Sequence, residues 1–124
     1  MLTVLIADDC PDVRRVLRQM LEDRCAVVCV EAANGLEAIA KAKISRPDLI
    51  ILDLSMPEMN GFDAATVLQK MMPRVPLFMF TCHSREVESQ AASVGIRAVF
   101  SKYTGINELV AQTSALLNRS AAMA

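Results

Sequence analysis

The chain has 124 residues, a length for which one hydrophobic core is stable without disulfides, so we predict a single domain over residues 1–124. Its 13 lysines and arginines nearly balance 14 aspartates and glutamates, and the resulting charge of −1 argues against direct nucleic-acid binding. The first residues lack the basic stretch of a signal peptide and no apolar run reaches membrane-spanning length, so we expect a cytoplasmic protein with no membrane contact.

Apolar runs alternate with helical patterns along the chain, beginning with a strand at residues 4–7. A helix follows from Pro11, since the fixed φ of proline suits a first helical position. Its apolar residues lie three and four positions apart: Val13, Val16, Leu17, Met20 and Leu21. A second strand at residues 26–30 leads through an Asn34-Gly35 turn to a second helix. That helix has looser apolar spacing, with Leu36, Ile39, Ala40 and Ile44.

Three further pairs of a strand and a helix complete the chain. We predict strands at residues 49–52, 75–80 and 98–100, followed by helices at 62–71, at 85–94 and over the last apolar pattern. This last helix carries Ile106, Leu109, Val110, Thr113, Leu116 and Leu117 on one face. Residues 120–124 are predicted to follow it as a short tail.

The strict alternation of strands and helices predicts an α/β fold with a parallel sheet covered on both faces. Five such units favour a doubly wound three-layer sandwich, and we expect the flavodoxin-like (βα)5 form of it, in which the five-stranded sheet has the order 2-1-3-4-5. In that order the connections reverse direction between the first and third strands. Ligands of open α/β sheets bind at this switch point, beyond the carboxyl ends of the strands.

Polar residues stand where four of the apolar runs stop. Asp8 and Asp9 follow the first strand, Asp53 the third, Thr81 the fourth and Lys102 the fifth. Because the carboxyl ends of parallel strands share one sheet edge, we expect these side chains to converge. Three converging carboxylates repel one another unless a cation neutralises them, and an all-oxygen ligand set suits Mg²⁺.

The types of these residues suit phosphoryl chemistry on an aspartate. A carboxylate can form a covalent phosphoenzyme, and Asp53 is the candidate nucleophile because it is single and follows the central strand. Asp8 and Asp9 would hold Mg²⁺, Lys102 would contact phosphoryl oxygens as a point charge, and the Thr81 hydroxyl would donate to them. Taken singly, the aspartates and Thr81 are as easily explained as helix caps or turn residues, and Lys102 alone would almost always be a surface charge, so the prediction depends on their conjunction.

These residues, together with the loop Asp53-Leu-Ser-Met-Pro-Glu-Met-Asn-Gly61, resemble the receiver domain of bacterial two-component response regulators. The resemblance covers nearly the whole chain. It implies that Asp53 is the phosphoacceptor for a histidine kinase, a histidine phosphotransfer protein or a small phosphodonor. It further implies that Asp9, Asp53 and the backbone carbonyl of Ser55 bind Mg²⁺ directly and that Asp8 binds it through water.

Ser55 and His83 lie two positions beyond Asp53 and Thr81, where receivers tune the loss of phosphate. His83 could therefore hydrogen-bond the phosphoryl group or position water, although an exposed loop histidine without such a role is the favoured explanation. Cys82, where the family prefers a small residue, would lie on the access path.

Two positions depart from the family pattern. Receivers usually carry a switch aromatic three residues before the lysine, where this chain has Val99, and a proline after it, where this chain has Tyr103. Phe100 is expected on the opposite face of the strand and does not replace the aromatic. We hypothesise that output relies on Thr81, on Tyr103 and on the surface of the fourth helix, fifth strand and fifth helix, which is also a candidate homodimer surface.

The favoured function is a phosphorylation-dependent switch of a two-component phosphorelay, with no output domain and with an unknown protein as its downstream target. Its only chemistry would be its own phosphorylation and dephosphorylation, so it would not be an enzyme with a turnover substrate. One alternative is a pseudo-receiver scaffold that binds partners without phosphorylation. Another is an aspartyl-phosphate phosphatase, although Ser55 stands where such an enzyme needs a second acid.

Overall fold

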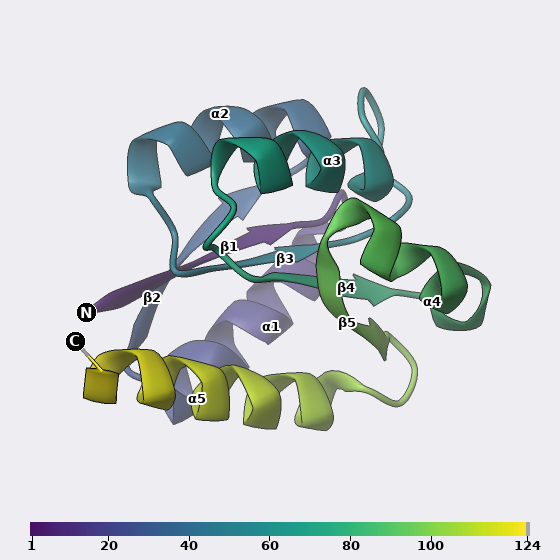
Figure 1. Cartoon of the computed structure of the whole chain (residues 1–124). Coiled ribbons are helices and arrows are strands. Elements are labelled where there is room, and N and C mark those ends of the chain that lie inside the picture. Colours follow the sequence, from purple (N-terminus) through teal and green to yellow (C-terminus); the bar gives the residue numbers. More distant parts are fainter. Residues whose placement is uncertain (124) are drawn as a thin grey trace.

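One parallel sheet organises the structure, a computed structural model that describes the backbone of residues 1–123 and the side chains of residues 1–119. The strands are β1 (Leu2–Ala7), β2 (Val27–Ala32), β3 (Leu49–Leu52), β4 (Leu77–Thr81) and β5 (Ile96–Ser101). The helices are α1 (Pro11–Arg24), α2 (Gly35–Ser45), α3 (Gly61–Met71), α4 (Ser84–Ala91), the short 3-10 helix η1 (Ala92–Val94) and α5 (Ile106–Met123). The strand order β2-β1-β3-β4-β5 confirms the predicted topology (Figure 1).

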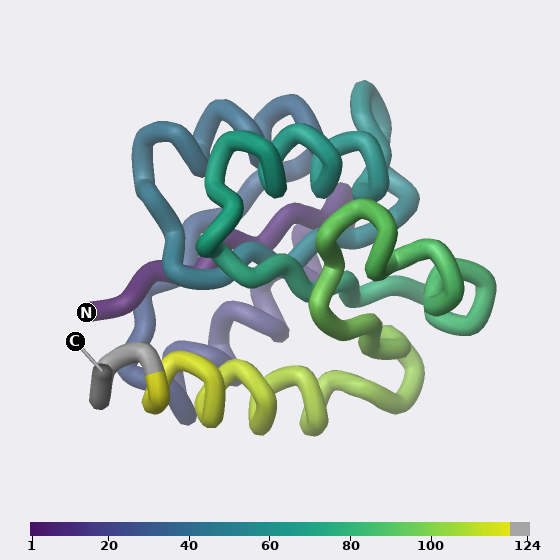
Figure 2. The backbone as a smooth tube through the Cα atoms, in the orientation of Figure 1, coloured from purple at the N-terminus to yellow at the C-terminus, as the bar shows by residue number. Residues whose placement is uncertain are grey.

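Helices cover both faces of this sheet. α2, α3 and α4 pack on one face, and α1 and α5 lie side by side on the other (Figures 1 and 2). Successive strand residues point to opposite faces, so Leu5 joins the first core and Ile6 the second. All four residues of β3 are buried, as expected of a central parallel strand. The continuous apolar runs in the sequence therefore have their cause in burial on both faces.

Side-chain size differs between the two cores. The helices on the first face present small residues to the sheet: Ala38, Ala42, Ala64 and Ala65. The second core is filled by larger side chains, and the rings of Phe78 and Phe100 meet edge to face at a centroid distance of 5.3 Å. Since small side chains permit close approach, α2 and α3 can pack close to this face of the sheet.

Asparagine side chains begin two of the helices. The Asn34 side chain accepts a hydrogen bond from the Glu37 N–H at 2.8 Å, and Asn60 accepts one from the Asp63 N–H at 2.9 Å. Both are N-caps, which satisfy donors that the first helical turn leaves free. The predicted Asn34-Gly35 turn is thus a helix start, with Gly35 as the first residue of α2.

Several predicted boundaries were too narrow. β1 starts two residues before the predicted strand and β2 ends two residues after it, because ladder hydrogen bonds continue beyond the apolar run, where Glu31 pairs with Ile6. The tail predicted at residues 120–124 is wrong for residues 120–123, which continue α5, while residue 124 lies outside the described residues. Within the described part, none of the helices combines the length and apolar character of a bilayer span.

The edge strand β2 is covered by side chains from α1 and α2. The Glu22 carboxylate accepts from the Cys29 N–H at 3.1 Å, and the Lys41 ammonium donates to the Glu31 carbonyl at 2.5 Å. Unpaired backbone groups at a sheet edge would otherwise be free to pair with another chain. These two contacts, one from α1 and one from α2, therefore satisfy backbone groups along the exposed edge of β2.

The four cysteines are free. Cys29 is buried in the second core, and burial raises the pKa of its thiol to about 12. Cys10 and Cys25 are partly buried, whereas Cys82 is exposed. Cys25 follows the last residue of α1 and precedes β2, so it does not share a strand face with Cys29.

Thr113 introduces a polar atom into the second core. Its side chain is fully buried on α5, and its Oγ1 has no hydrogen-bond partner among the described residues. We expect Thr113→Val to raise the free energy of unfolding by about 1 kcal/mol, because valine has the same shape without the desolvation penalty. Urea unfolding measures this change, with Thr66→Val as control, since Thr66 is exposed and its hydroxyl donates to Phe62. A less stable Thr113→Val protein would contradict the prediction.

Candidate functional site

The carboxyl edge of the sheet brings together the predicted acidic residues. Asp8 and Asp9 follow β1, and Asp53 follows β3, the neighbour of β1. Carboxylate oxygens of all three residues lie within 4.8 Å of one another. The predicted convergence is therefore confirmed.

Backbone hydrogen bonds continue the sheet ladder into this cluster. The Asp8 N–H donates to the Ala32 carbonyl at 3.0 Å, and the Asp53 N–H donates to the Ala7 carbonyl at 2.9 Å. Asp8 and Asp53 are only 2% and 6% exposed, whereas Asp9 is exposed. The cluster thus has a rigid, buried floor and one side that faces solvent.

Lys102 supplies the positive charge in this cluster. Its ammonium lies 2.6 Å from Oδ2 of Asp8 and 3.0 Å from Oδ2 of Asp53. Its backbone N–H donates to the Thr81 carbonyl at 3.0 Å, which fixes the start of the side chain beside β4. Lys102 thus bridges the two buried carboxylates, from a strand that is not adjacent to either of theirs.

The pKa shifts follow from this arrangement. Burial raises the pKa of Asp53 and the charge of Asp8 adds to the rise, while the Lys102 hydrogen bond opposes it. Burial disfavours the charged form of Lys102, but its bonds to Asp8 and Asp53 outweigh that effect and raise the pKa of Lys102. One ammonium therefore contacts two of the three carboxylates, and the cluster keeps an excess of negative charge.

The donor set fits a magnesium ion. The oxygens of Asp8, Asp9 and Asp53 converge within the span of a single cation, and hard oxygen ligands are those that Mg²⁺ prefers. Mg²⁺ also keeps several water ligands, which the exposed side at Asp9 can admit. The excess negative charge supplies the electrostatic attraction for such an ion.

Two glycines allow the loop after Asp53 to fold tightly. The Gly61 N–H donates to the Leu54 carbonyl at 2.8 Å, and a Cβ on Gly61 would lie 2.1 Å from the Asp53 carbonyl oxygen. The Gly35 N–H donates to the Met59 carbonyl at 3.1 Å, so the start of α2 holds the same loop. Ser55 lies exposed in this loop, directly beyond the floor of the site.

Thr81 ends β4 with its side chain fully buried. Its Oγ1 accepts the His83 N–H at 3.2 Å, which leaves the hydroxyl proton free to donate elsewhere. His83 is exposed at the residue before α4, and its ring makes no hydrogen bond with the described residues. The tuning roles of His83 and Ser55 stay predictions.

The residues beside Lys102 lie as the strand alternation predicts. Val99 packs against the first core, and Phe100 is buried in the second, against Phe78. Tyr103 is 78% exposed, and the neighbouring Cys82 thiol raises the pKa of Tyr103. Phe100 therefore belongs to the core beneath α5, while Tyr103 is the aromatic side chain available at the surface.

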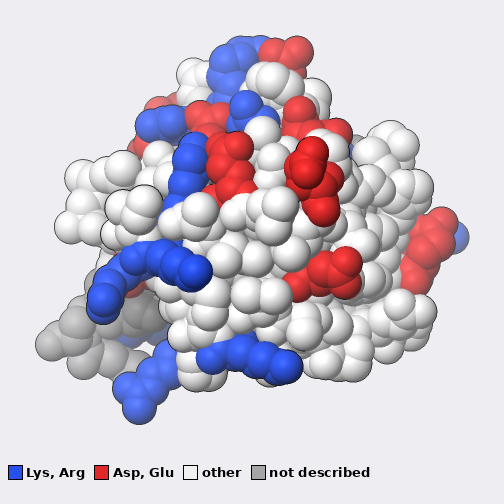
Figure 3. Space-filling model, turned by 90° about the horizontal axis from the view of Figure 1, so that it is seen from above, with Lys and Arg blue, Asp and Glu red and all other residues white. Residues whose placement is uncertain are grey.

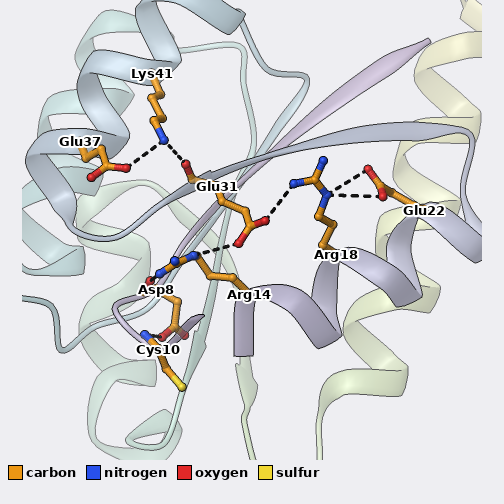
Figure 4. A network of polar contacts seen from close by, with 8 residues as sticks. All are labelled: Asp8, Cys10, Arg14, Arg18, Glu22, Glu31, Glu37 and Lys41. Atoms are coloured by element: carbon orange, nitrogen blue, oxygen red, sulfur yellow. Dashed lines mark hydrogen bonds and ion pairs between the residues drawn. The ribbon is translucent and has the colours of Figure 1, made fainter. Parts of the chain in front are cut away.

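Sequence reasoning missed two residues next to the acidic cluster. The Arg14 guanidinium donates to the backbone carbonyl of Asp8 at 2.6 Å and to the Glu31 carboxylate at 2.9 Å (Figure 4). Arg14 lies in α1 and Glu31 in β2, within segments that fit the receiver family, but the resemblance and the spacing assign neither residue a role. Only the packing of α1 beside β2 brings them to Asp8.

Comparison with known proteins places this fold and site in a family. The sequence model of the family described as the response regulator receiver domain matches residues 4–114 of this chain. The chain belongs to this family, and its acidic cluster lies where receiver domains bind Mg²⁺.

Curated relatives are signalling proteins. The chain is 38% identical to the chemotaxis protein CheY of Thermotoga maritima over 76 residues, which cover 61% of this chain and 63% of that protein. It is 34% identical to the autoinducer 1 sensor kinase/phosphatase LuxN of Vibrio harveyi over 120 residues, 97% of this chain and 14% of LuxN. The match to the protein-glutamate methylesterase/protein-glutamine glutaminase of Pyrococcus horikoshii is 42% over 84 residues, and covers 67% of the chain but only 23% of that longer protein.

Solved receivers share the fold. The response regulator TrrA of Thermotoga maritima, in complex with Mg(2+)-BeF, matches at a TM-score of 0.85 and 28% identity, covering 94% of this chain and 99% of TrrA. Vibrio cholerae CheY4 matches at a TM-score of 0.83 and 29% identity, over 94% of this chain and 98% of that one. A receiver of Methanospirillum hungatei, at 22% identity and a TM-score of 0.88 over 100% of this chain and 99% of that one, shows the fold alone.

Removing the ammonium tests the charge balance of the site. We expect Lys102→Met to lower the free energy of unfolding in EDTA by roughly 3–5 kcal/mol, because two buried carboxylates lose their cationic partner. Saturating Mg²⁺ should recover much of this loss, since the metal supplies positive charge at the same carboxylates. Chemical unfolding with and without Mg²⁺ measures both effects.

Lys70→Met is the matched control, because Lys70 is exposed in the last turn of α3, away from the acidic cluster. It should shift stability little and equally in EDTA and in Mg²⁺. A Lys102→Met protein as stable as the wild type in EDTA would show that Lys102 does not balance these charges.

Proposed function

We propose that this receiver domain is switched by phosphorylation of Asp53, with a histidine kinase or a histidine phosphotransfer protein as the donor. The observation that carries the proposal is the geometry around Asp53. This carboxylate is nearly buried, lies with Asp8 and Asp9 in one cluster, and has the Lys102 ammonium 3.0 Å from its Oδ2. Asp8 is also buried in this cluster and contacts Lys102, but its Oδ1 accepts the Cys10 N–H, whereas Asp53 follows the central strand β3.

The proposed reaction transfers a phosphoryl group to Asp53. An Asp53 carboxylate oxygen attacks phosphorus, the bond from phosphorus to the donor nitrogen or oxygen breaks, and an acyl phosphate forms. Mg²⁺, held by Asp8, Asp9, Asp53 and the Ser55 carbonyl, would offset charge on the transferred oxygens. Lys102 would exchange its contact with Asp53 for a phosphoryl oxygen, and the Thr81 hydroxyl would donate to another.

The solved TrrA complex supports this proposal, because its Mg(2+)-BeF is bound to a receiver with the same fold. The complete set of Asp8, Asp9, Asp53, Thr81 and Lys102 supports it further. The methylesterase relative combines a matching segment with a longer chain, so an enzymatic output domain is one context in which receivers occur. For residues 1–124 we propose one receiver domain whose only chemistry is its own phosphorylation and dephosphorylation.

The setting we propose is a phosphorelay in the bacterial cytoplasm, with a downstream target outside these residues. Lys and Arg side chains are interspersed with Asp and Glu over the face formed by α2 and α3 (Figure 3). This pattern supports protein partners over nucleic acid, which binds extended patches of positive charge. The target would recognise the surface of α4, β5 and α5, on which a second copy of the chain is also a candidate partner.

Phosphorylation of Asp53 has a direct test. We expect wild-type protein incubated with Mg²⁺ and acetyl phosphate to gain the mass of one phosphoryl group, and Asp53→Asn to gain none. Intact-mass spectrometry measures the product, and omission of Mg²⁺ should suppress it. Asp63→Asn is the matched control, because Asp63 is an exposed acid in the first turn of α3 and should leave the reaction unchanged.

An unmodified wild type under every donor would reject the proposal in favour of the scaffold alternative. Release of phosphate from small phosphomonoesters at a sustained rate, with no change in protein mass, would instead favour the phosphatase alternative.

Tyr103 is the residue we propose for output, since Val99 replaces the usual switch aromatic. We expect beryllium fluoride with Mg²⁺ to shift the amide signals of α4, β5 and α5, and Tyr103→Ala to reduce these shifts without changing Asp53 phosphorylation. Tyr103→Phe is the control that keeps the ring and removes only the hydroxyl group. Sedimentation of the same samples reports whether this surface forms a homodimer. Equal shifts in wild type and Tyr103→Ala would exclude the role of Tyr103.

A further inference from the structure

Arg14 joins the acidic cluster to the edge strand of the sheet. One guanidinium nitrogen donates to the Asp8 carbonyl at 2.6 Å, and Nε donates to the Glu31 carboxylate at 2.9 Å (Figure 4). The Arg14 side chain is only 16% exposed, so both contacts are shielded from water. A planar guanidinium donates in fixed directions, and two simultaneous partners therefore define its position.

The Asp8 carbonyl is half of the peptide bond that leads to Asp9. The Asp8 N–H is held by Ala32, and Oδ1 of Asp8 accepts the Cys10 N–H at 2.9 Å. By contrast, the exposed Asp9 carboxylate makes no hydrogen bond or ion pair with the described residues. No side-chain contact among the described residues orients Asp9, and Arg14 holds the peptide group that precedes it.

Glu31 is itself held in place on several sides. Arg18 donates to its other carboxylate oxygen at 2.9 Å, and Lys41 donates to its backbone carbonyl at 2.5 Å (Figure 4). Burial opposes ionisation of Glu31, but its hydrogen bonds with Arg18 and Arg14 outweigh this effect and lower the pKa of Glu31. Glu31 therefore presents a fixed negative charge to Arg14 at neutral pH.

We propose that Arg14 is a positioning residue for the metal site: it orients the Asp8-Asp9 peptide so that Asp9 meets Asp8 and Asp53, and Glu31 holds Arg14 in place. This inference rests on the proposed function, because it assigns Arg14 a part in binding Mg²⁺. Arg14 touches none of the three carboxylates in any contact that the described residues make, and acts through the backbone.

The electrostatic effect of Arg14 and its proposed positioning effect predict opposite changes in Mg²⁺ affinity when Arg14 is removed. Removing a positive charge close to three carboxylates would, by Coulomb's law alone, strengthen Mg²⁺ binding. Releasing the Asp8-Asp9 peptide would weaken it, and loss of groups that orient metal ligands typically costs 10–100-fold in affinity. The sign of the change in Mg²⁺ affinity therefore separates the two effects.

The test compares Arg14→Gln with Arg15→Gln by calorimetric titration of the metal-free protein with MgCl₂. Arg15 is the matched control, since it lies one residue away, is exposed and pairs only with Asp12 at 3.3 Å. We expect Arg14→Gln to weaken Mg²⁺ binding by about tenfold or more, and Arg15→Gln to leave it equal or slightly stronger. Equal or tighter binding by Arg14→Gln would overturn the proposal.

Two further measurements exclude a general loss of structure. In metal-free protein, Arg14→Gln should shift the amide signals of Asp8, Asp9 and Cys10 while the signals of β4 and α5 stay in place. Adding Glu31→Gln to Arg14→Gln should weaken Mg²⁺ binding no further, because coupled residues do not contribute additively. Fully additive losses, or signals that move throughout the domain, would count against positioning.

The outcomes also separate this inference from the proposed function. A wild type that binds no Mg²⁺ would reject the proposed function, and the metal-free amide signals would still decide whether Arg14 orients Asp9. A wild type that binds Mg²⁺ and is phosphorylated, together with an unaffected Arg14→Gln, would reject the inference alone.

Discussion

Two buried carboxylates on either side of one ammonium are the contact on which the site depends. Asp8 and Asp53 would repel each other at the floor of the sheet edge, and the Lys102 ammonium lies within 3.0 Å of both. One cation against three carboxylates leaves the balance negative. The fold therefore holds an excess of negative charge at this sheet edge. Binding of a metal ion or transfer of a charged group to the site would change that excess.

Sheet topology decides which residue type can serve at each position. β1 and β3 are neighbours, so short aspartate side chains at their ends already meet. β5 lies two strands from β3, a separation of about 10 Å at ordinary strand spacing. Only a long side chain can cross the end of β4, and Lys102 does so while its backbone is tied to Thr81. A glycine-bearing loop and the start of α2 then close the opposite side of Asp53.

The same contacts relate the site to surfaces where other molecules could bind. Thr81 and Lys102 connect Asp53 to the ends of β4 and β5, beside which Val99 and Tyr103 take different roles: one packs into the core and the other is exposed. On the other side, Arg14 and Glu31 connect Asp8 to the edge strand and to α2. The acidic cluster around Asp53 is thus connected by side-chain contacts to β5 in one direction along the sheet edge and to β2 in the other.

Periodicity and strand-end chemistry in the sequence were enough to predict the alternating strands and helices and the converging Asp8, Asp9, Asp53 and Lys102, because burial on two faces imposes continuous apolar strands. The strand order was predicted by analogy with the flavodoxin-like fold. The sequence did not predict the end of β2, where backbone pairing extends past the apolar residues to Glu31. It also did not predict that α5 continues beyond residue 119. The sequence did not predict the contact of Arg14 with the Asp8 carbonyl either. Side-chain to backbone contacts between separate elements depend on how α1 packs beside β2, and only the tertiary structure decides that.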